Sequence, residues 1–476
     1  MDTKKLRQKI LDLAIHGKLV PQDPNDEPAS VLLERIRAEK EKLIKEGKIK
    51  APKKSKSASD TSHYPKDVPF EVPKGWEWLR GNDIFLPMES ISPQGDFFDY
   101  IDIESIDNKR NIVSSPKHLP VKDAPSRATR LVRKGDVLFS MVRPYLRNIA
   151  RVESNGFIAS TGFYVCRCSC AIDSEYCLYL MLSEYVVDGL NQFMKGDNSP
   201  SINNSHITSW IYPIPPIAEQ RRICEKIDSL FSLTDSLDRE QALLQNAVGL
   251  CRRTVLDLAI RGKLVPQNPS EEPAIELLRR INPAFKASDN LHYMNSLPVG
   301  WVTARLGDII EIISGTSYRK TDITATTRGL KILRGGNIQN GQIILRDDDV
   351  YISDKLINER VNVKKGDIVL VASTGSSELI GKAAISLIDY PRTQIGAFLR
   401  IIRSRSRELS DYLGIIFQSE LYKSHIREVA KGTNINNIKA SYLTEFIIPI
   451  PPLAEQRRII EKIRSLFAIL SSLLKD

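Results

Sequence analysis

Apolar residues recur at every third or fourth position through the middle of the chain, from Ile223 to Leu258. This spacing is typical of a coiled-coil seam and predicts one continuous helix of about 50 Å. Nine of the eleven seam positions are apolar. Thr234 and Gln241 are the exceptions and lie near the midpoint, where polar seam residues can fix the register of paired helices. The seam comprises Ile223, Ile227, Leu230, Thr234, Leu237, Gln241, Leu244, Val248, Cys251, Val255 and Leu258.

The chain contains two repeated motifs, arranged as if a ring had been opened inside a helix. Residues 11–36 are identical to residues 256–281 at 19 of 26 positions, and residues 213–231 match residues 449–467 at 16 of 19. The second motif runs into the first in mid-chain, whereas the chain ends carry one motif each. Repeats of this length predict two pseudo-twofold halves rather than a solenoid. We therefore expect the central helix to pair antiparallel with a composite of the C-terminal and N-terminal helices.

The N-terminal and C-terminal copies repeat the apolar spacing of the central helix. The residues that continue it are Leu6, Ile10 and Leu13 at one end and Ile459, Ile463, Leu466, Leu470 and Leu473 at the other. Gly17 and Gly262 follow the last expected turn of their helices, and Pro21 and Pro266 come soon after. Glycine often ends a helix and a following proline cannot continue it, so both helices are predicted to stop there.

Polar residues at the start of the long helix are also repeated without change. Seam packing does not require identical surface residues, and the regions between the repeats have diverged. We interpret the matched residues as surfaces that bind two copies of one partner, and local capping and helix-surface needs are the alternative. The partner-binding candidates are Glu219, Arg221, Arg222, Lys226, Glu455, Arg457, Arg458 and Lys462.

Each half also carries a longer, divergent segment with the pattern of an α+β domain. Both segments contain a turn and strand (134–140 and 365–371), an alternating strand with a glycine (160–167 and 393–401) and a predicted helix (173–194 and 408–430). Each ends in a polar loop with Ile-Asn-Asn, at 202–204 and at 435–437. The predicted organisation is an N-terminal helical repeat (1–45), a lysine-rich linker (46–72), a first domain (73–212), a central repeat with the long helix (213–281), a linker (282–297), a second domain (298–448) and a C-terminal helix (449–476).

Two similar scaffolds with different loops suit a protein that reads two different short DNA sequences. Arg, Asn, Gln, Ser and Thr read base edges, while Lys, Arg and backbone amides hold phosphates. The DNA-binding candidates of the first domain are Arg127, Arg130, Arg143, Tyr145, Arg147, Asn148, Lys195, Asn198, Ser199, Asn203 and Asn204. Those of the second are Tyr318, Arg319, Lys320, Arg334, Asn337, Thr374, Ser376, Ser377, Lys431, Thr433, Asn434, Asn436 and Asn437. Each is also open to interpretation as an ordinary loop residue, and the Ile-Asn-Asn segments as turn chemistry.

Composition supports this hypothesis and argues against several others. The net charge of +10 suits a polyanionic partner, and the longest apolar runs are too short for a membrane span. The N-terminus lacks a signal-peptide pattern, and the six cysteines form no even framework, so we expect a soluble cytoplasmic protein. No glycine-rich phosphate loop is present, and Cys166, Cys168 and Cys170 have the spacing of one strand face rather than of a zinc site. We predict neither a catalytic centre nor a metal site.

These features together resemble the DNA-specificity (S) subunits of type I restriction–modification enzymes. The similarity covers nearly the whole chain and depends on the two long helices, the repeated PIPPxAEQRRI segments, the GDxL strands and the circular order of the repeats. It implies an α+β fold with two target-recognition domains, joined by two long antiparallel coiled-coil helices in a circular pseudo-twofold repeat.

The resemblance also implies a function and a set of partners. Each domain would read one half of a bipartite site in double-stranded DNA, and the helices would dock two adenine-N6 methyltransferase subunits. The subunit itself would be non-catalytic. S-adenosylmethionine, ATP and Mg would be bound by partner subunits, the ATP by the motor–nuclease subunits. Two other interpretations stay open: a free-standing two-domain DNA-binding regulator, and a coiled-coil scaffold that binds no nucleic acid.

Overall fold

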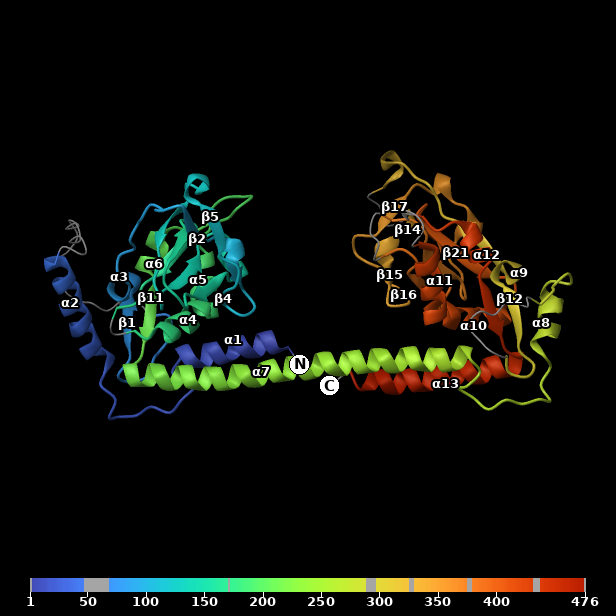
Figure 1. Cartoon of the computed structure of the whole chain (residues 1–476), viewed down its shortest axis with the longest axis horizontal. Helices are drawn as coiled ribbons and strands as arrows, with labels where there is room; N and C mark the ends of the chain where they lie inside the picture. Colours follow the sequence, from blue (N-terminus) through green and yellow to red (C-terminus); the bar gives the residue numbers. More distant parts are fainter. Residues whose placement is uncertain are drawn as a thin grey trace. The chain divides into compact units, whose positions relative to one another are not determined.

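A computed structural model describes residues 2–46, 68–169, 172–287, 297–324, 329–374, 379–430 and 437–474. The chain divides into two compact units, Met1–Gln241 and Ala242–Asp476, and helix α7 (Ile217–Ile260) contributes to both (Figure 1). Most of the two predicted linkers lies outside the described residues. No helix in the described part of the chain combines the length and the apolar character that crossing a bilayer requires.

Each unit pairs its part of α7 with a second, antiparallel helix. In the first unit α1 (Thr3–Ile15) runs beside α7, with Thr3 donating to Asp238 at 2.8 Å and Arg7 pairing with Asp235. In the second unit α13 (Leu453–Ser472) takes this place, and Arg252 of α7 donates to Ser471 at 2.7 Å. The predicted antiparallel helix pairs are thus confirmed within each unit.

The predicted seam is buried at the start of α7 and half-buried at Val255 and Leu258 near its end, and several positions between them are exposed. Ile223 and Ile227 are fully buried, whereas Leu237 and Leu244 remain 39% and 41% exposed. Gln241 is exposed as well. The prediction of a continuous buried seam was therefore wrong for Leu237, Gln241, Leu244 and Cys251, which are exposed. Thr234 is buried and donates its hydroxyl to the Phe231 carbonyl at 2.8 Å, so it needs no polar partner on another helix.

The first unit contains an α+β domain built on a two-stranded sheet and two larger sheets. The small sheet pairs β1 (Glu77–Arg80) with β11 (Ile211–Ile214). The five-stranded sheet has the order β10 (Phe163–Cys166), β7 (Val137–Ser140), β8 (Ile149–Arg151), β4 (Ile112–Val113) and β3 (Ile106–Asp107). The four-stranded sheet has the order β5 (Lys117–Pro120), β2 (Phe97–Ile101), β9 (Phe157–Ser160) and β6 (Ala128–Leu131). The helices are α2 (Ala29–Lys45), α3 (Gly81–Ile84), α4 (Ser174–Leu182), α5 (Glu184–Asn191) and α6 (Asn204–Ser209).

The second unit repeats this plan with shorter peripheral strands. Here β12 (Val302–Arg305) pairs with β22 (Ile447–Ile450). The four-stranded sheet has the order β13 (Ile310–Ser314), β21 (Leu399–Ser404), β18 (Ile368–Val371) and β19 (Ala383–Ile385). Two smaller sheets consist of β17 (Val350–Ile352), β14 (Leu330–Leu333) and β20 (Thr393–Ile395), and of β15 (Ile338–Gln339) and β16 (Gln342–Ile343). The helices are α8 (Ala274–Ile281), α9 (Leu306–Ile309), α10 (Arg407–Gln418), α11 (Glu420–Ala430) and α12 (Ala440–Thr444).

The single helix predicted in each domain is in fact two helices. Ser183 separates α4 from α5, and Ser419 separates α10 from α11; both serines have extended backbone angles. The Ser183 hydroxyl accepts the Val186 N–H at 3.3 Å and so caps the second helix. Serine competes with helical hydrogen bonding in this way, which explains why an uninterrupted apolar pattern was a poor guide to the break.

The Ile-Asn-Asn segments are not structurally equivalent. The Ile202 N–H donates to the Met141 carbonyl at 2.9 Å, and the matching bond in the second unit runs from Ile438 to Ala372 at 2.7 Å. Ile202 thus corresponds to Ile438 rather than to Ile435, and the segment leading into α12 begins three residues later than the sequence match suggested.

Gly17 and Gly262 end α1 and α7 as predicted and also allow each domain to approach its helices. Both have left-handed φ angles, +64° and +66°. A Cβ on Gly17 would lie 2.2 Å from Pro73, and one on Gly262 would lie 2.4 Å from Pro298. Only glycine fits both requirements, so the start of each domain packs directly against the end of its helix.

Candidate nucleic-acid interface

The first domain brings two of its candidate loops together. Arg143 lies in the loop between β7 and β8; its guanidinium donates to the Asn198 carbonyl at 2.7 Å and its backbone N–H to Pro200 at 2.8 Å. Lys195 and Ser201 exchange two backbone hydrogen bonds of 3.0 Å and close the second loop. The side chains of Lys195, Asn198 and Ser199 are exposed. Segments about 50 residues apart in sequence therefore present polar groups on one surface.

The loop that carries Arg143 has an unusual backbone. Arg143 and Arg147 have φ angles of +48° and +54° and flank a 3₁₀ turn at Pro144–Leu146. Side chains other than glycine, asparagine and aspartate rarely adopt this conformation, which costs about 1–2 kcal/mol per residue. The turn holds Tyr145 and Leu146 at 46% and 43% exposure. An exposed aromatic ring on a strained turn is consistent with a contact surface.

Arg127 lies at the same end of the domain. Its carbonyl accepts the Thr161 N–H at 2.8 Å, and the next residue, Gly162, accepts the Met141 N–H at 2.9 Å. The Arg127 side chain is exposed. Backbone hydrogen bonds to Thr161 and Gly162 therefore place Arg127 close to Met141, where the loop that carries Arg143 begins.

Several first-domain candidates are occupied inside the fold. Asn148 is buried, and the guanidinium of Arg147 donates to the Gln8 side chain at 2.9 Å and to the Leu182 carbonyl. Asn203 caps α6 by accepting the His206 N–H at 3.3 Å, which confirms the turn-chemistry alternative for this residue. Arg130 and Asn204 are half-buried, with their Nε and Oδ1 atoms shielded from solvent. Asn148 and Arg147 therefore have roles inside the fold, Arg130 and Asn204 are partly withdrawn from the surface, and Asn203 is exposed while it caps α6.

The second domain places its described candidates less closely together. Arg319 and Lys320 are exposed around the 3₁₀ turn Lys320–Asp322, and Arg334 is exposed with its guanidinium on the Asp348 carbonyl at 3.0 Å. Asn437 is exposed and forms a β-bridge with Ser373, the residue before Thr374. The remaining candidates, Ser376, Ser377, Lys431, Thr433, Asn434 and Asn436, lie outside the described residues.

Two second-domain candidates are structural. Asn337 is 2% exposed; its amide donates to Asp349 at 2.6 Å and to the Ile344 carbonyl at 2.9 Å, while its Oδ1 accepts the Arg334 N–H. Tyr318 is half-buried and packs against the cluster of Leu330 and Ile352. Both were selected for polar or aromatic character alone, which does not reveal burial.

Phe398 is an exposed residue that sequence reasoning missed. Its ring is 67% exposed, while its carbonyl accepts the N–H groups of Ala372 and Ser373 at 3.0 Å each. The corresponding carbonyl in the first domain belongs to Gly162, so the two domains differ at this position by a whole aromatic ring. The glycines of the two alternating strands, Gly162 and Gly396, are not equivalent, so matching them in the sequence hides the difference.

Half of the predicted partner surface is an internal joint. The buried carboxylate of Glu219 accepts hydrogen bonds from Trp76 Nε1 at 2.9 Å and Gln22 Nε2 at 2.8 Å. Glu455 accepts the same bonds from Trp301 and Gln267, at the same distances. Burial raises the pKa of both carboxyl groups, and the hydrogen bonds oppose that shift.

Arg222 and Arg458 also belong to this joint. Arg222 donates to Asp26 at 3.2 Å, and Arg458 pairs with Glu271. Glu219, Glu455, Arg222 and Arg458 are therefore corrected as partner-binding candidates, and the alternative of local structural needs holds for them. Four candidates stay exposed: Arg221, Lys226, Arg457 and Lys462.

Among the described residues, one group of side chains could in principle hold a metal ion. Potential ligand atoms of Asp173, Glu175 and Cys224 lie within 4.8 Å of one another. Asp173 caps α4, and burial raises the pKa of the Cys224 thiol and of the Glu175 carboxyl. The Asp173 carboxylate accepts the Glu175 N–H at 2.8 Å, so its place in this group is set at least in part by helix capping.

Comparison with known proteins finds relatives of one kind. Residues 298–476 match the family model described as type I restriction modification DNA specificity domain. The specificity subunits of the type I restriction enzymes EcoAI and EcoEI from Escherichia coli are 29% and 28% identical, over 97% and 99% of this chain and 88% and 90% of their own lengths. By these matches the chain is similar to the specificity subunits of type I restriction enzymes.

A solved structure supports this assignment at the level of the fold. It is described as "Structural basis underlying complex assembly and conformational transition of the type I R-M system", and it has a TM-score of 0.65 and 26% identity to this chain. It covers 86% of this chain and 94% of its own. The predictions of a type I specificity subunit, of its mixed helix-and-strand fold and of a non-catalytic role are thereby confirmed.

Proposed function

We propose that this specificity subunit reads a bipartite site in double-stranded DNA, with one half-site for each α+β domain. The observation that carries the proposal is that one scaffold presents two different sets of loops. The strands β7 and β10 and the strands β18 and β21 pair in the same register, yet Arg143 and Tyr145 occur in one loop and Thr374 in the other. A change of loops on a fixed scaffold changes which base edges can be bound.

The subunit also docks two adenine-N6 methyltransferase subunits, and through the complex the motor–nuclease subunits. Support comes from exposed residues that are identical in both repeats and not used by the internal joint. Ala218, Arg221 and Glu225 form an exposed stripe on α7, and Ala454, Arg457 and Glu461 form the same stripe on α13. Spacings of three and four place each set on one helix face, opposite the buried Ile223 and Ile459. The bound S-adenosylmethionine, ATP and Mg belong to the partner subunits.

A domain exchange tests the reading function. Residues 73–212 are replaced by the first domain of another specificity subunit, and N6-methyladenine is mapped across the genome of cells that carry the complete complex. We expect one half of the methylated motif to change and the other half to remain. A change in both halves, or methylation that does not depend on this gene, would contradict independent reading. Tight sequence-specific binding by the isolated chain without a methyltransferase would instead favour a free-standing regulator.

A further inference from the structure

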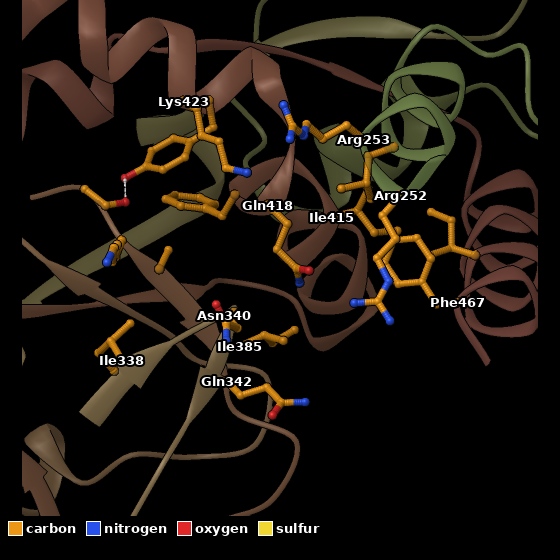
Figure 2. Close-up of a pocket in the computed structure, with 18 of the residues that line it drawn as sticks. Arg252, Arg253, Ile338, Asn340, Gln342, Ile385, Ile415, Gln418, Lys423 and Phe467 are labelled. Atoms are coloured by element: carbon orange, nitrogen blue, oxygen red, sulfur yellow. Dashed lines mark hydrogen bonds between the residues drawn. The ribbon is translucent and has the colours of Figure 1, made fainter. Parts of the chain in front are cut away.

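The second unit contains a large cavity between its helix pair and its α+β domain. Its volume is about 1270 Å³, and Figure 2 shows Arg252, Arg253 and Phe467 on one side and Asn340, Gln342 and Ile385 on another. Apolar residues form much of the wall. The charged lining residues are all cations: Arg252, Arg253, Lys382, Lys423, Arg427 and Arg464. A cavity that gathers six cations without a lining carboxylate has a strongly positive potential.

Two of these cations pair with carboxylates among the described residues, and the other four do not. Arg464 pairs with Asp411 at 2.7 Å, Arg427 pairs with Glu420, and Arg252 lies over the Phe467 ring. No ion pair within the described structure involves the side chains of Arg253, Lys382 or Lys423. Arg253 and Lys423 lie on the same side of the cavity (Figure 2). Burial and the neighbouring Arg253 lower the pKa of Lys423, as expected for like charges close together.

The first unit fills the corresponding space with its own side chain. The backbone N–H of Ser140 donates to the Asn148 carbonyl at 3.1 Å. In the second unit the backbone N–H of Val371 donates to the Lys382 carbonyl at 2.9 Å. The residue before each acceptor is Arg147 in the first unit and Gly381 in the second, and both have positive φ angles. Arg147 extends to Gln8 of α1 and to the end of α4. Gly381 has no side chain, and a Cβ there would lie 2.9 Å from Ile426, so the second unit has no group that corresponds to the Arg147 guanidinium.

Charge differs between the units at the same positions. Arg7 of α1 pairs with Asp235, whereas its counterpart Arg252 meets Ser471, which carries no charge. Gln8 corresponds to Arg253, and Asp228 corresponds to Arg464. Each of these differences makes the second unit more positive. The first unit therefore neutralises its cations internally, and the second leaves an excess of positive charge around a space.

We propose that this cavity is a binding site for phosphate esters, which the backbone of the bound DNA supplies. The inference rests on the proposed function and adds an anchor that the first unit lacks. Two elements connect the cavity to the predicted reading loops: Gly381 and Lys382 end the segment that begins with Thr374, and α11 continues directly into residues 431–437. A strand whose bases reach those loops has its phosphates next to the same elements. Guanidinium and ammonium groups bind such phosphates without reading sequence.

The test uses the complete methyltransferase complex and residues that the first unit already accommodates. Arg253→Gln installs the counterpart of Gln8, and Ser471→Asp installs the counterpart of Asp235. DNA affinity is measured from 50 to 200 mM salt, and the methylated motif is mapped. Loss of one phosphate contact lowers the slope of log affinity against log salt by about 0.9, so the fall in affinity across this range becomes about 3-fold smaller. We expect that change with an unaltered motif. Arg261→Gln, directly after the end of α7 and outside the cavity, is the charge-matched control and should leave the slope unchanged.

Three results would overturn the inference, and thermal unfolding shows whether each variant is folded. An unchanged salt slope for Arg253→Gln, Ser471→Asp and Lys423→Ala would show that the cavity holds no backbone phosphate. Binding of ATP or inorganic phosphate to the purified chain, lost in Arg253→Gln while the DNA slope stays the same, would assign the site to a free phosphate ester. If the unmodified complex failed to bind its DNA site, the proposed function itself would be contradicted. This outcome is seen without any variant, so it cannot be confused with a failure of the cavity proposal alone.

Discussion

Trp76 donates its indole N–H to the buried carboxylate of Glu219 at 2.9 Å and so joins the start of the first domain to the start of the long helix. The same carboxylate accepts Gln22 from the segment that follows α1. Three parts of the chain therefore meet at one side chain, and Trp301, Glu455 and Gln267 repeat the arrangement in the second unit. Each joint ties a domain to its helix pair.

Removing the carboxylate should weaken this joint. Glu219→Ala leaves the buried Trp76 N–H without an acceptor and creates a small void, so we expect the free energy of unfolding to fall by about 1–3 kcal/mol. Urea unfolding followed by tryptophan fluorescence measures the change. In a double-mutant cycle with Trp76→Phe the two losses should not add, since both variants remove the same bond. Full additivity would indicate that the bond contributes little.

The joints should also make stability depend on pH. Burial raises the pKa of Glu219 and Glu455 above that of an ordinary glutamate, so the folded state binds their protons more tightly than the unfolded state. The stability from these protons is present below the unfolded pKa and is lost as pH rises through the folded pKa. The double variant Glu219→Gln, Glu455→Gln should reduce this loss between about pH 4.5 and neutrality. Denaturant midpoints measured across that range give the answer, and equal slopes in the variant and the parent would contradict the assignment.

Neighbouring arginines should separate structural from docking roles. Arg222→Ala with Arg458→Ala breaks the pairs with Asp26 and Glu271 and should destabilise each unit by about 1–3 kcal/mol. Arg221→Glu with Arg457→Glu changes exposed residues, so stability should remain near that of the parent while co-purification with methyltransferase is lost. Mass photometry of the reconstituted complex shows for each pair of variants whether the methyltransferase subunits are still bound, and denaturant unfolding gives the change in stability. An intact complex with the second pair would place the docking surface elsewhere.

Repeat periodicity made the architecture predictable, but it could not show why the repeats are identical. The seam residues Ile223 and Ile459 and the helix-ending Gly17 were correctly placed from spacing and residue type. Glu219 was misassigned because its partner Gln22 belongs to the other repeated motif: two segments that contact each other were duplicated together, so both stayed identical. Burial of Asn148 and Asn337 depends on tertiary packing that a loop sequence does not reveal. The cavity also depends on tertiary structure, because Gly381 corresponds to Arg147 only through hydrogen bonding.

The middle of α7 offers a test of how the two half-sites are spaced. The side chains from Arg239 to Ala247 are exposed, so an insertion between Glu240 and Gln241 disturbs no buried contact. Seven added residues preserve the seam phase and lengthen the helix by about 10 Å. At about 3.4 Å per base pair, this length corresponds to at most about three base pairs of added spacer. Rotation about the duplex opposes large changes, so we expect about one to three base pairs of added spacer.

Each half-site should stay the same, because the loops that carry Arg143 and Thr374 are untouched. The methylated motif of the insertion variant is the measurement, with a seven-residue replacement at the same position as the control. Full activity on the original spacer would show that α7 does not set the distance.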